Sequence, residues 1–228
     1  SMFGWRHKQT GLRRFREAYW EVPRKNAKST GAATFGISML VQDREVSPEI
    51  FCGATTEKQA FMVFRPMRMM LQKLPGLRNL AGIEVHKSII STPHDEGRIE
   101  PIIGDPGDGD APSCYLGDEY HEHKSDAQYT TMLGGTDSRE QPFIFMITTA
   151  GENIEGPCYD MRRDCVDILE KASIEENLFV YIWTVDKDDD WRDPSILAKA
   201  NPNLGVSVEL EGLLSKQRRA IRNPRYAP

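Results

Sequence analysis

The sequence has little of what several protein classes require. No uninterrupted apolar run approaches the roughly 20 residues that cross a bilayer, which argues against a membrane-spanning protein. The cysteines, Cys52, Cys114, Cys158 and Cys165, form no CxxC pair and lie mostly in apolar runs, so they indicate buried reduced thiols rather than a disulfide framework. The formal net charge of −5 does not favour nucleic-acid binding by the molecule as a whole.

Basic residues are nevertheless concentrated in two places, and any contact with DNA would have to use such a local patch. The two clusters are Arg13, Arg14 and Arg16 near the start, and Lys216, Arg218, Arg219, Arg222 and Arg225 near the end. A solvated charged face is the alternative interpretation of each cluster.

Strand-like and helix-like stretches alternate along most of the 228 residues. The expected strands are 15–22, 50–54, 82–91, 99–103, 113–118, 142–149 and 178–185. The expected helices are 28–41, 56–74, 126–133, 157–171, 196–200 and 208–222. An acidic loop is expected at 104–113. This alternation predicts a three-layer α/β domain, with a mainly parallel central sheet flanked by helices and ligands at the carboxyl ends of the strands.

The stretch VPRKNAKST, residues 22–30, lies between an expected strand and an expected helix. A phosphate-binding loop has the pattern G-x-x-x-x-G-K-[ST], and here Val22 and Ala27 stand where its glycines would be, before Lys28 and Ser29. Taken alone, the stretch fits a phosphate loop and a basic surface turn equally well. If it is a phosphate loop, we expect a negative φ at Ala27, the range in which alanine is tolerated.

A second motif, CYLGDEYHEH, favours the phosphate loop. Asp118 follows an apolar strand, where it can hold the shell of a Mg²⁺ ion, and Glu119 can polarise an attacking water. With Lys28 and Ser29 on another strand, this pair predicts a P-loop ATPase. The strand 50–54 lies between the two motifs, as suits the branch of these ATPases with an added central strand and a catalytic glutamate.

Two further groups of residues have competing interpretations. Thr148 and Thr149 finish the apolar strand in FIFMITTAG, where their hydroxyls can sense the γ-phosphate, or they are simply β-branched residues at a strand end. His121 and His123 lie near acidic residues, but no HExxH spacing supports a zinc site.

Four stretches together resemble the ATPase portion of a large terminase subunit of tailed bacteriophages: FGWRHKQTGLRRFREAYWEVPRKNAKST, CYLGDEYHEH, QPFIFMITTAG and DDDWRDPSILAKANPNLGVSV. The resemblance covers nearly the whole chain. It implies a Walker A loop in which Arg24 contacts the γ-phosphate, a Walker B pair at Asp118 and Glu119, and a coupling motif at Thr148 and Thr149. The implied ATP-binding residues are Pro23, Arg24, Lys25, Asn26, Ala27, Lys28, Ser29 and Thr30.

The resemblance also implies roles and boundaries. Lys28, Arg24 and Glu119 would be catalytic, and Ser29 and Asp118 would hold Mg²⁺. Residues 1–2 are interpreted as a tag remnant, 3–205 as the ATPase core, and 206–228 as a helix and the start of a linker toward a nuclease domain. We expect that nuclease domain, and the family's adenine-contacting Trp-Gln element, to lie outside this chain.

The function implied is that of an ATP-hydrolysing motor that drives double-stranded DNA into a procapsid in the host cytoplasm, away from any membrane. The implied partners are DNA, a portal protein, a small terminase subunit and further copies in a ring, with Arg98 or Arg139 as the arginine acting on a neighbour's site. Two alternatives remain: a helicase-like DNA translocase, and a DNA- or capsid-docking module with a vestigial nucleotide site.

Overall fold

The computed structural model describes residues 2–104 and 109–226 and shows one central sheet. The expected loop at 104–113 therefore lies partly outside the described residues. The strands are β1 (Glu17–Glu21), β2 (Glu49–Ala54), β3 (Glu84–Val85), β4 (Ile90–Thr92), β5 (Gly97–Ile103), β6 (Cys114–Gly117), β7 (Phe143–Thr148) and β8 (Leu178–Ile182). Their order in the sheet is β3-β4-β5-β2-β6-β7-β1-β8. Pairing is parallel from β5 to β8, and β3 and β4 add an antiparallel edge.

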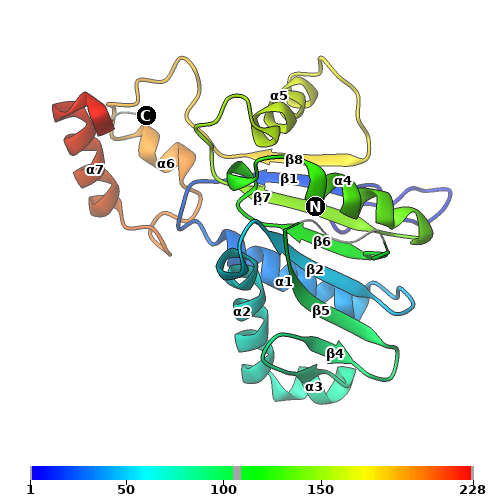
Figure 1. Cartoon of the computed structure of the whole chain (residues 1–228). Coiled ribbons are helices and arrows are strands. Elements are labelled where there is room, and N and C mark those ends of the chain that lie inside the picture. The colour runs from blue at the N-terminus through cyan, green and yellow to red at the C-terminus, as the bar shows by residue number, and fades with distance from the viewer. Residues whose placement is uncertain (1, 105–108, 227–228) are drawn as a thin grey trace.

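Helices cover both faces of the sheet, which confirms the expected three-layer α/β architecture (Figure 1). One face carries α1 (Lys28–Gln42) and α2 (Glu57–Lys73), and the other carries α4 (Ala127–Gly134) and α5 (Pro157–Leu169). The helix α3 (Pro75–Ala81) follows α2, and α6 (Ile196–Ala200) and α7 (Leu210–Arg222) follow β8 beyond the sheet edge. Short 3-10 turns are η1 (Tyr120–Glu122), η2 (Gly135–Ser138) and η3 (Pro224–Tyr226).

Alternate residues of the central strands supply the two apolar cores. In β7, Phe143 and Phe145 face α1, while Ile144 and Met146 face α4 and α5. All residues of β7 are buried, because a parallel strand covered on both faces is apolar on both sides. The sheet is therefore a rigid platform whose carboxyl edge can position polar side chains.

One local expectation differs from the structure. The strand that lies between β1 and β6 in the sheet is β7, whereas 50–54 (β2) lies on the far side of β6. The order along the chain did not reveal this, because parallel strands are joined by crossovers. The helix α2 ends at Lys73, close to the expected end at residue 74, and Pro75 begins the separate helix α3, where a missing N–H costs nothing.

The first basic cluster is only partly exposed: Arg13 is buried, Arg14 is half-buried and Arg16 is exposed. Arg13 is 1% exposed, pairs with the buried carboxylate of Asp43 and donates to the carbonyl oxygen of Gln141. Its guanidinium also lies 4.9 Å from the ring of Phe3, and Arg14 stacks on aromatic rings near it. These arginines therefore fix the start of the chain against α1 and β7.

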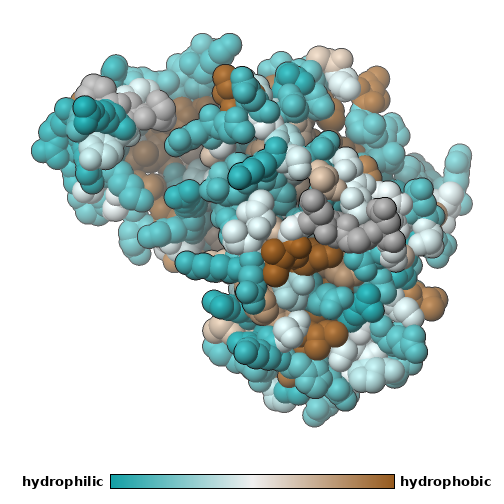
Figure 2. All heavy atoms as spheres, in the orientation of Figure 1, coloured by the Kyte–Doolittle hydropathy of each residue, from teal (hydrophilic) through white to brown (hydrophobic). Residues whose placement is uncertain are grey.

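The second cluster lies on an exposed face. Lys216, Arg218, Arg219 and Arg222 are all exposed on α7, and Figure 2 shows a hydrophilic surface there, at the upper left. Among the described residues, no helix is both long and apolar enough to cross a membrane.

The Arg13–Asp43 pair gives a stability prediction. Asp43→Leu leaves a buried guanidinium without its counter-charge, so it should lower the free energy of unfolding by about 3–5 kcal/mol. The double variant Arg13→Met/Asp43→Leu removes both charges and should recover most of that loss, as measured by urea denaturation. A double variant as unstable as the single one would contradict the assignment.

Candidate functional site

The carboxyl ends of β1, β6 and β7 bring the sequence motifs together. Glu21 of β1 is in register with Thr148 of β7, and the N–H of Val22 donates to the carbonyl oxygen of Thr148 at 3.1 Å. On the other side of β7, Gly117 of β6 is in register with Met146. The loop after β1, the acidic pair after β6 and the threonines of β7 therefore share one edge of the sheet.

The loop between β1 and α1 turns through the left-handed region at two residues that are not glycine. Lys25 has a φ of 70° and Ala27 a φ of 61°. The expected negative φ at Ala27 is wrong: the tight turn into α1 needs a left-handed residue there, and alanine adopts it at a cost of about 1–2 kcal/mol. Ala27 is the N-cap of α1 and provides no side-chain cap, so the first N–H groups of the helix remain for an anion.

Lys28 begins α1 and is buried, with 6% of its side chain exposed. Its Nζ lies 3.9 Å from Oε2 of Glu119. Burial lowers the pKa of Lys28, while the carboxylates of Glu119 and Asp118 raise it again. The structure thus brings the lysine of the loop next to Glu119, and close enough to Asp118 for the charge of that residue to affect it.

Asp118 is 1% exposed and has one unsatisfied oxygen. Its Oδ1 accepts the N–H of Glu119 at 3.0 Å, and its Oδ2 has no hydrogen-bond partner among the described residues. Burial, and then the charge of Glu119, raise the pKa of Asp118 to about 6, against the opposing effects of the Glu119 N–H, Lys28 and the Ser29 hydroxyl. An unsatisfied carboxylate oxygen beside a hydroxyl is the kind of oxygen ligand set that fits Mg²⁺.

His121 connects Glu119 to the threonines of β7. Its ring Nδ1 lies 3.3 Å from Oε2 of Glu119 and 3.1 Å from Oγ1 of Thr148. The main-chain N–H of His121 donates to the same Oγ1 at 3.1 Å. Oγ1 of Thr149 lies 3.4 Å from Nδ1. The sequence had placed His121 only in a weak zinc pattern. Its position two residues after Glu119 was the signal that could have identified it.

A cavity of about 1030 Å³ opens beside the loop. This is at the upper end of the roughly 300–1,000 Å³ found for small-molecule sites. Its lining includes Arg24, His121, Thr149, Trp183 and Trp191. The exposed residue Arg24 therefore lies at this cavity, whose lining residues include neither Lys28 and Ser29 nor the acidic pair.

The other residues of the predicted loop differ in exposure, and the two predicted trans-acting arginines lie elsewhere. In the loop, Lys25 and Thr30 are exposed, Pro23 is half-buried, and Asn26 is buried. Arg98 pairs with Glu49 at 3.1 Å, and Arg139 donates to the carbonyl oxygen of Ala111 at 2.7 Å.

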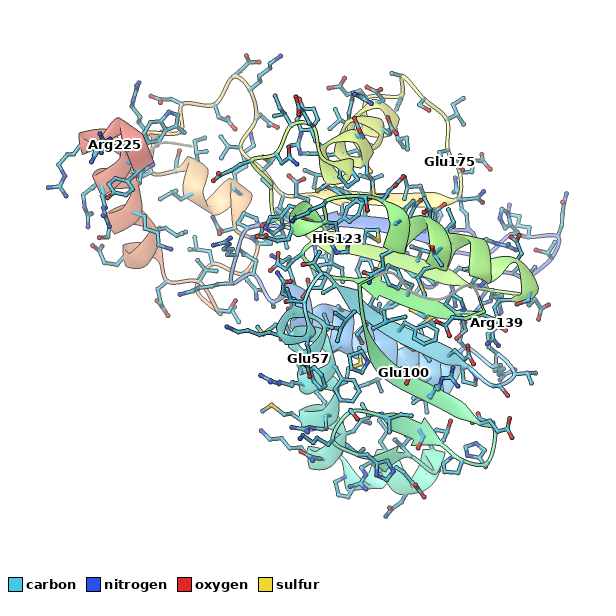
Figure 3. The ribbon with its side chains drawn as sticks, in the orientation of Figure 1. Glu57, Glu100, His123, Arg139, Glu175 and Arg225 are labelled. Atoms are coloured by element: carbon cyan, nitrogen blue, oxygen red, sulfur yellow. The ribbon has the colours of Figure 1, made fainter. Side chains whose placement is uncertain are left out.

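Both arginines are thus held within the chain near the amino end of β2, and Figure 3 shows Arg139 far from His123 beside the site. Their assignment to a neighbour's site stays a prediction. Nε2 of His123 lies 3.4 Å from the carbonyl oxygen of Asp118, and burial lowers the pKa of His123.

Two family models match this chain. The model for the terminase large subunit ATPase domain matches residues 1–166, and the model for the terminase large subunit endonuclease domain matches residues 172–227. The expectation that the nuclease domain lies wholly outside the chain is therefore wrong: a part of it is present. Within that second stretch, β8 nevertheless pairs with β1 in the central sheet.

The chain is also similar to a curated protein in sequence and to solved structures in fold. Protein YmfN of Escherichia coli (strain K12) is 50% identical over 147 residues, which are 64% of this chain and 32% of that protein. The HK97 bacteriophage large terminase has a TM-score of 0.81 at 20% identity, over 93% of this chain and 44% of its own. A large terminase from a thermophilic bacteriophage has a TM-score of 0.55 at 13% identity, over 90% of this chain and 44% of its own. The chain thus spans about a third of the curated relative and less than half of either terminase.

The strain at Ala27 can be measured. Ala27→Gly removes the clash of Cβ at positive φ and should raise the free energy of unfolding by about 1 kcal/mol. Ala32→Gly, inside α1, is the matched control and should lower it by at least about 0.5 kcal/mol. Urea denaturation measures both, and a loss of stability in Ala27→Gly would show that the loop has a different conformation in solution.

The raised pKa of Asp118 gives a pH prediction for the metal-free protein. Its folded pKa of about 6 exceeds the unfolded value of about 3.9, so its charge destabilises the folded state above pH 6, and the penalty disappears as the pH falls toward 4. Asp118→Asn should therefore raise the free energy of unfolding by about 2 kcal/mol at pH 7.5. In EDTA-containing buffer, the gain should be smaller at pH 4.5. An equal gain in the free energy of unfolding at both pH values would show that the raised pKa of Asp118 is not its cause.

Proposed function

Since the chain belongs to the terminase large subunit family, we propose that it is the ATP-hydrolysing motor of a machine that moves double-stranded DNA into a viral procapsid. The observation that carries the proposal is the convergence of Lys28, Asp118 and Glu119 at the carboxyl edge of the sheet, beside the amino end of α1. This is the arrangement that phosphoryl transfer from a nucleoside triphosphate requires.

The phosphates of ATP would lie on the loop 22–29. The free N–H groups of the first turn of α1 offer donors to the phosphate oxygens, and Lys28 offers a buried positive charge. Arg24, exposed beside the cavity, would neutralise charge on the γ-phosphate. Positioning and charge neutralisation of this kind supply most of the catalysis in phosphoryl transfer.

The acidic pair would divide two tasks. Ser29 and Asp118 would hold Mg²⁺, which would supply charge neutralisation at the β- and γ-phosphates. Glu119 would orient the attacking water and accept its proton. Its side chain is 29% exposed, so water can reach the carboxylate, while Oε2 lies near Lys28 and His121.

His121 would pass the state of the site to β7. It lies within hydrogen-bond distance of Thr148 and Thr149 and near the carboxylate of Glu119. A shift of Glu119 on hydrolysis would therefore move a side chain that is bonded to the coupling threonines. Through this contact, Thr148 and Thr149 could sense hydrolysis at the site, as their predicted role requires.

Family membership supports a proposal about the wider assembly. We propose a homo-oligomeric ring at the procapsid in the host cytoplasm, with DNA, a portal protein and a small terminase subunit as partners. The exposed basic face of α7 offers a positive surface for DNA phosphates. We keep residues 3–205 as the ATPase core, because β8 and the segment after α6 contact β1 and its loop.

Two substitutions test the chemistry. Glu119→Gln should retain Mg²⁺-ATP binding and lower turnover about 10²–10⁴-fold, because the amide cannot accept the proton. Lys28→Ala should lose both binding and turnover. Calorimetry measures binding and phosphate release measures turnover, with Glu175→Gln, at an exposed position away from the site, as the control (Figure 3).

Normal turnover in Glu119→Gln would exclude its role as the base. A wild-type chain that binds no Mg²⁺-ATP would favour the docking module with a vestigial site.

A further inference from the structure

The segment NPNLGVS, residues 201–207, lies against the phosphate loop. Figure 1 shows the chain between α6 and α7 running beside the loop that joins β1 to α1. Nothing in the catalytic scheme uses this segment, although it carries two asparagines and a glycine in a short stretch. Its contacts with the loop give it a role.

Asn26 is the centre of these contacts. Its Nδ2 donates to Oδ1 of Asn201 at 2.9 Å, and its Oδ1 accepts the main-chain N–H of Asn203 at 3.0 Å. The same Nδ2 also donates to the carbonyl oxygen of Pro23 at 3.1 Å. Asn26 and Asn201 are 3% and 7% exposed, so these bonds are shielded from water. A third bond, from the hydroxyl of Ser207 to the carbonyl oxygen of Lys25, spans 2.6 Å.

The segment is itself held in shape. The main-chain carbonyl oxygen of Asn203 accepts hydrogen bonds from the N–H groups of Val206 and Ser207. The side-chain Nδ2 of Asn203 donates to the Ser207 hydroxyl at 2.9 Å. Gly205 has a φ of 80°, which a residue with Cβ adopts only with strain. A preorganised segment can hold a strained partner, because it loses little entropy in doing so.

The part of the loop that the segment contacts is the part that needs support. Lys25 and Ala27 both have positive φ without being glycine, and Asn26 lies between them. Three hydrogen bonds from a rigid segment, at about 0.5–1.5 kcal/mol each, are of the size needed to offset strain of about 1–2 kcal/mol per residue.

We propose that residues 201–207 form a clasp that holds the glycine-poor phosphate loop in its nucleotide-binding conformation, with Asn201 as its main positioning residue. The clasp lies in the stretch that matches the terminase endonuclease domain, so it links that stretch to the ATP site. Because coupling is reciprocal, a nucleotide bound on the loop also stabilises the clasp. The nucleotide part of this proposal rests on the proposed ATPase function, but the support of the loop does not.

Hydrogen–deuterium exchange of the whole chain without nucleotide tests the clasp directly. Asn201→Ala removes the acceptor of Asn26 and should speed exchange of the amides in residues 24–29 about tenfold. Val206→Ala is the matched control, because Val206 lies in the same segment with an exposed side chain that makes no hydrogen bond, and it should leave that exchange unchanged. Unchanged exchange in Asn201→Ala, or an equal effect in Val206→Ala, would overturn the proposal.

Nucleotide binding and turnover give the second readout. Asn201→Ala should weaken Mg²⁺-ATP binding about tenfold and leave kcat at saturating ATP near the wild-type value, since the clasp touches no reacting atom. In the wild type, Mg²⁺-ATP should slow exchange in residues 203–208. A lower kcat of Asn201→Ala with unchanged ATP affinity would contradict the clasp. Exchange in residues 203–208 that is the same with and without Mg²⁺-ATP would also contradict it.

Two outcomes separate this proposal from the ATPase function. If the wild type binds no ATP, the proposed function fails, and the nucleotide-free exchange still decides the clasp. If Asn201→Ala does not fold, Ser207→Ala, at an exposed position, removes the bond to Lys25 and should speed exchange at residues 25–27. Unchanged exchange in that variant would then overturn the proposal.

Discussion

The turn between β1 and α1 is the constraint on which the rest of the site depends. A phosphate loop must point successive N–H groups inward, and this requires left-handed backbone at positions where glycine costs least. In this chain Lys25 and Ala27 adopt that conformation instead. A strained turn of this kind persists only when its surroundings determine it. Here β1, α1 and the segment 201–207 provide those surroundings.

The electrostatics of the site follow from the same geometry. Because the turn buries Lys28 near Asp118 and Glu119, one buried cation lies close to a buried carboxylate and to a partly exposed one. Asp118 keeps an unsatisfied oxygen and a raised pKa, which are costs to the empty protein. Bound Mg²⁺ and phosphate would remove those costs, so ligand binding would stabilise the folded protein. His121 then lies where a change in Glu119 reaches Thr148 directly.

Sequence patterns predicted much of this structure, for identifiable physical reasons. Buried parallel strands such as β7 are continuous apolar runs, and Lys28-Ser29 and Asp118-Glu119 follow such runs, so their meeting at one edge could be foreseen. The sign of φ at Ala27 could not be read from the residue type, because it is set by the turn as a whole. The burial of Arg13 and the contact of Asn26 with Asn201 were also hidden, because both join segments far apart in the sequence. The endonuclease match in residues 172–227 was missed because β8 continues the alternation of the ATPase sheet.

The central claim is that the loop without glycines is already built to hold the phosphates of ATP. A crystal structure of the chain with Mg²⁺ and a non-hydrolysable ATP analogue tests it most directly. The account predicts the phosphates against the N–H groups of residues 26–29, with Lys25 and Ala27 still at positive φ and a cation between Ser29 and Asp118. A nucleotide bound elsewhere, or a loop that has lost its positive φ values on binding, would contradict it.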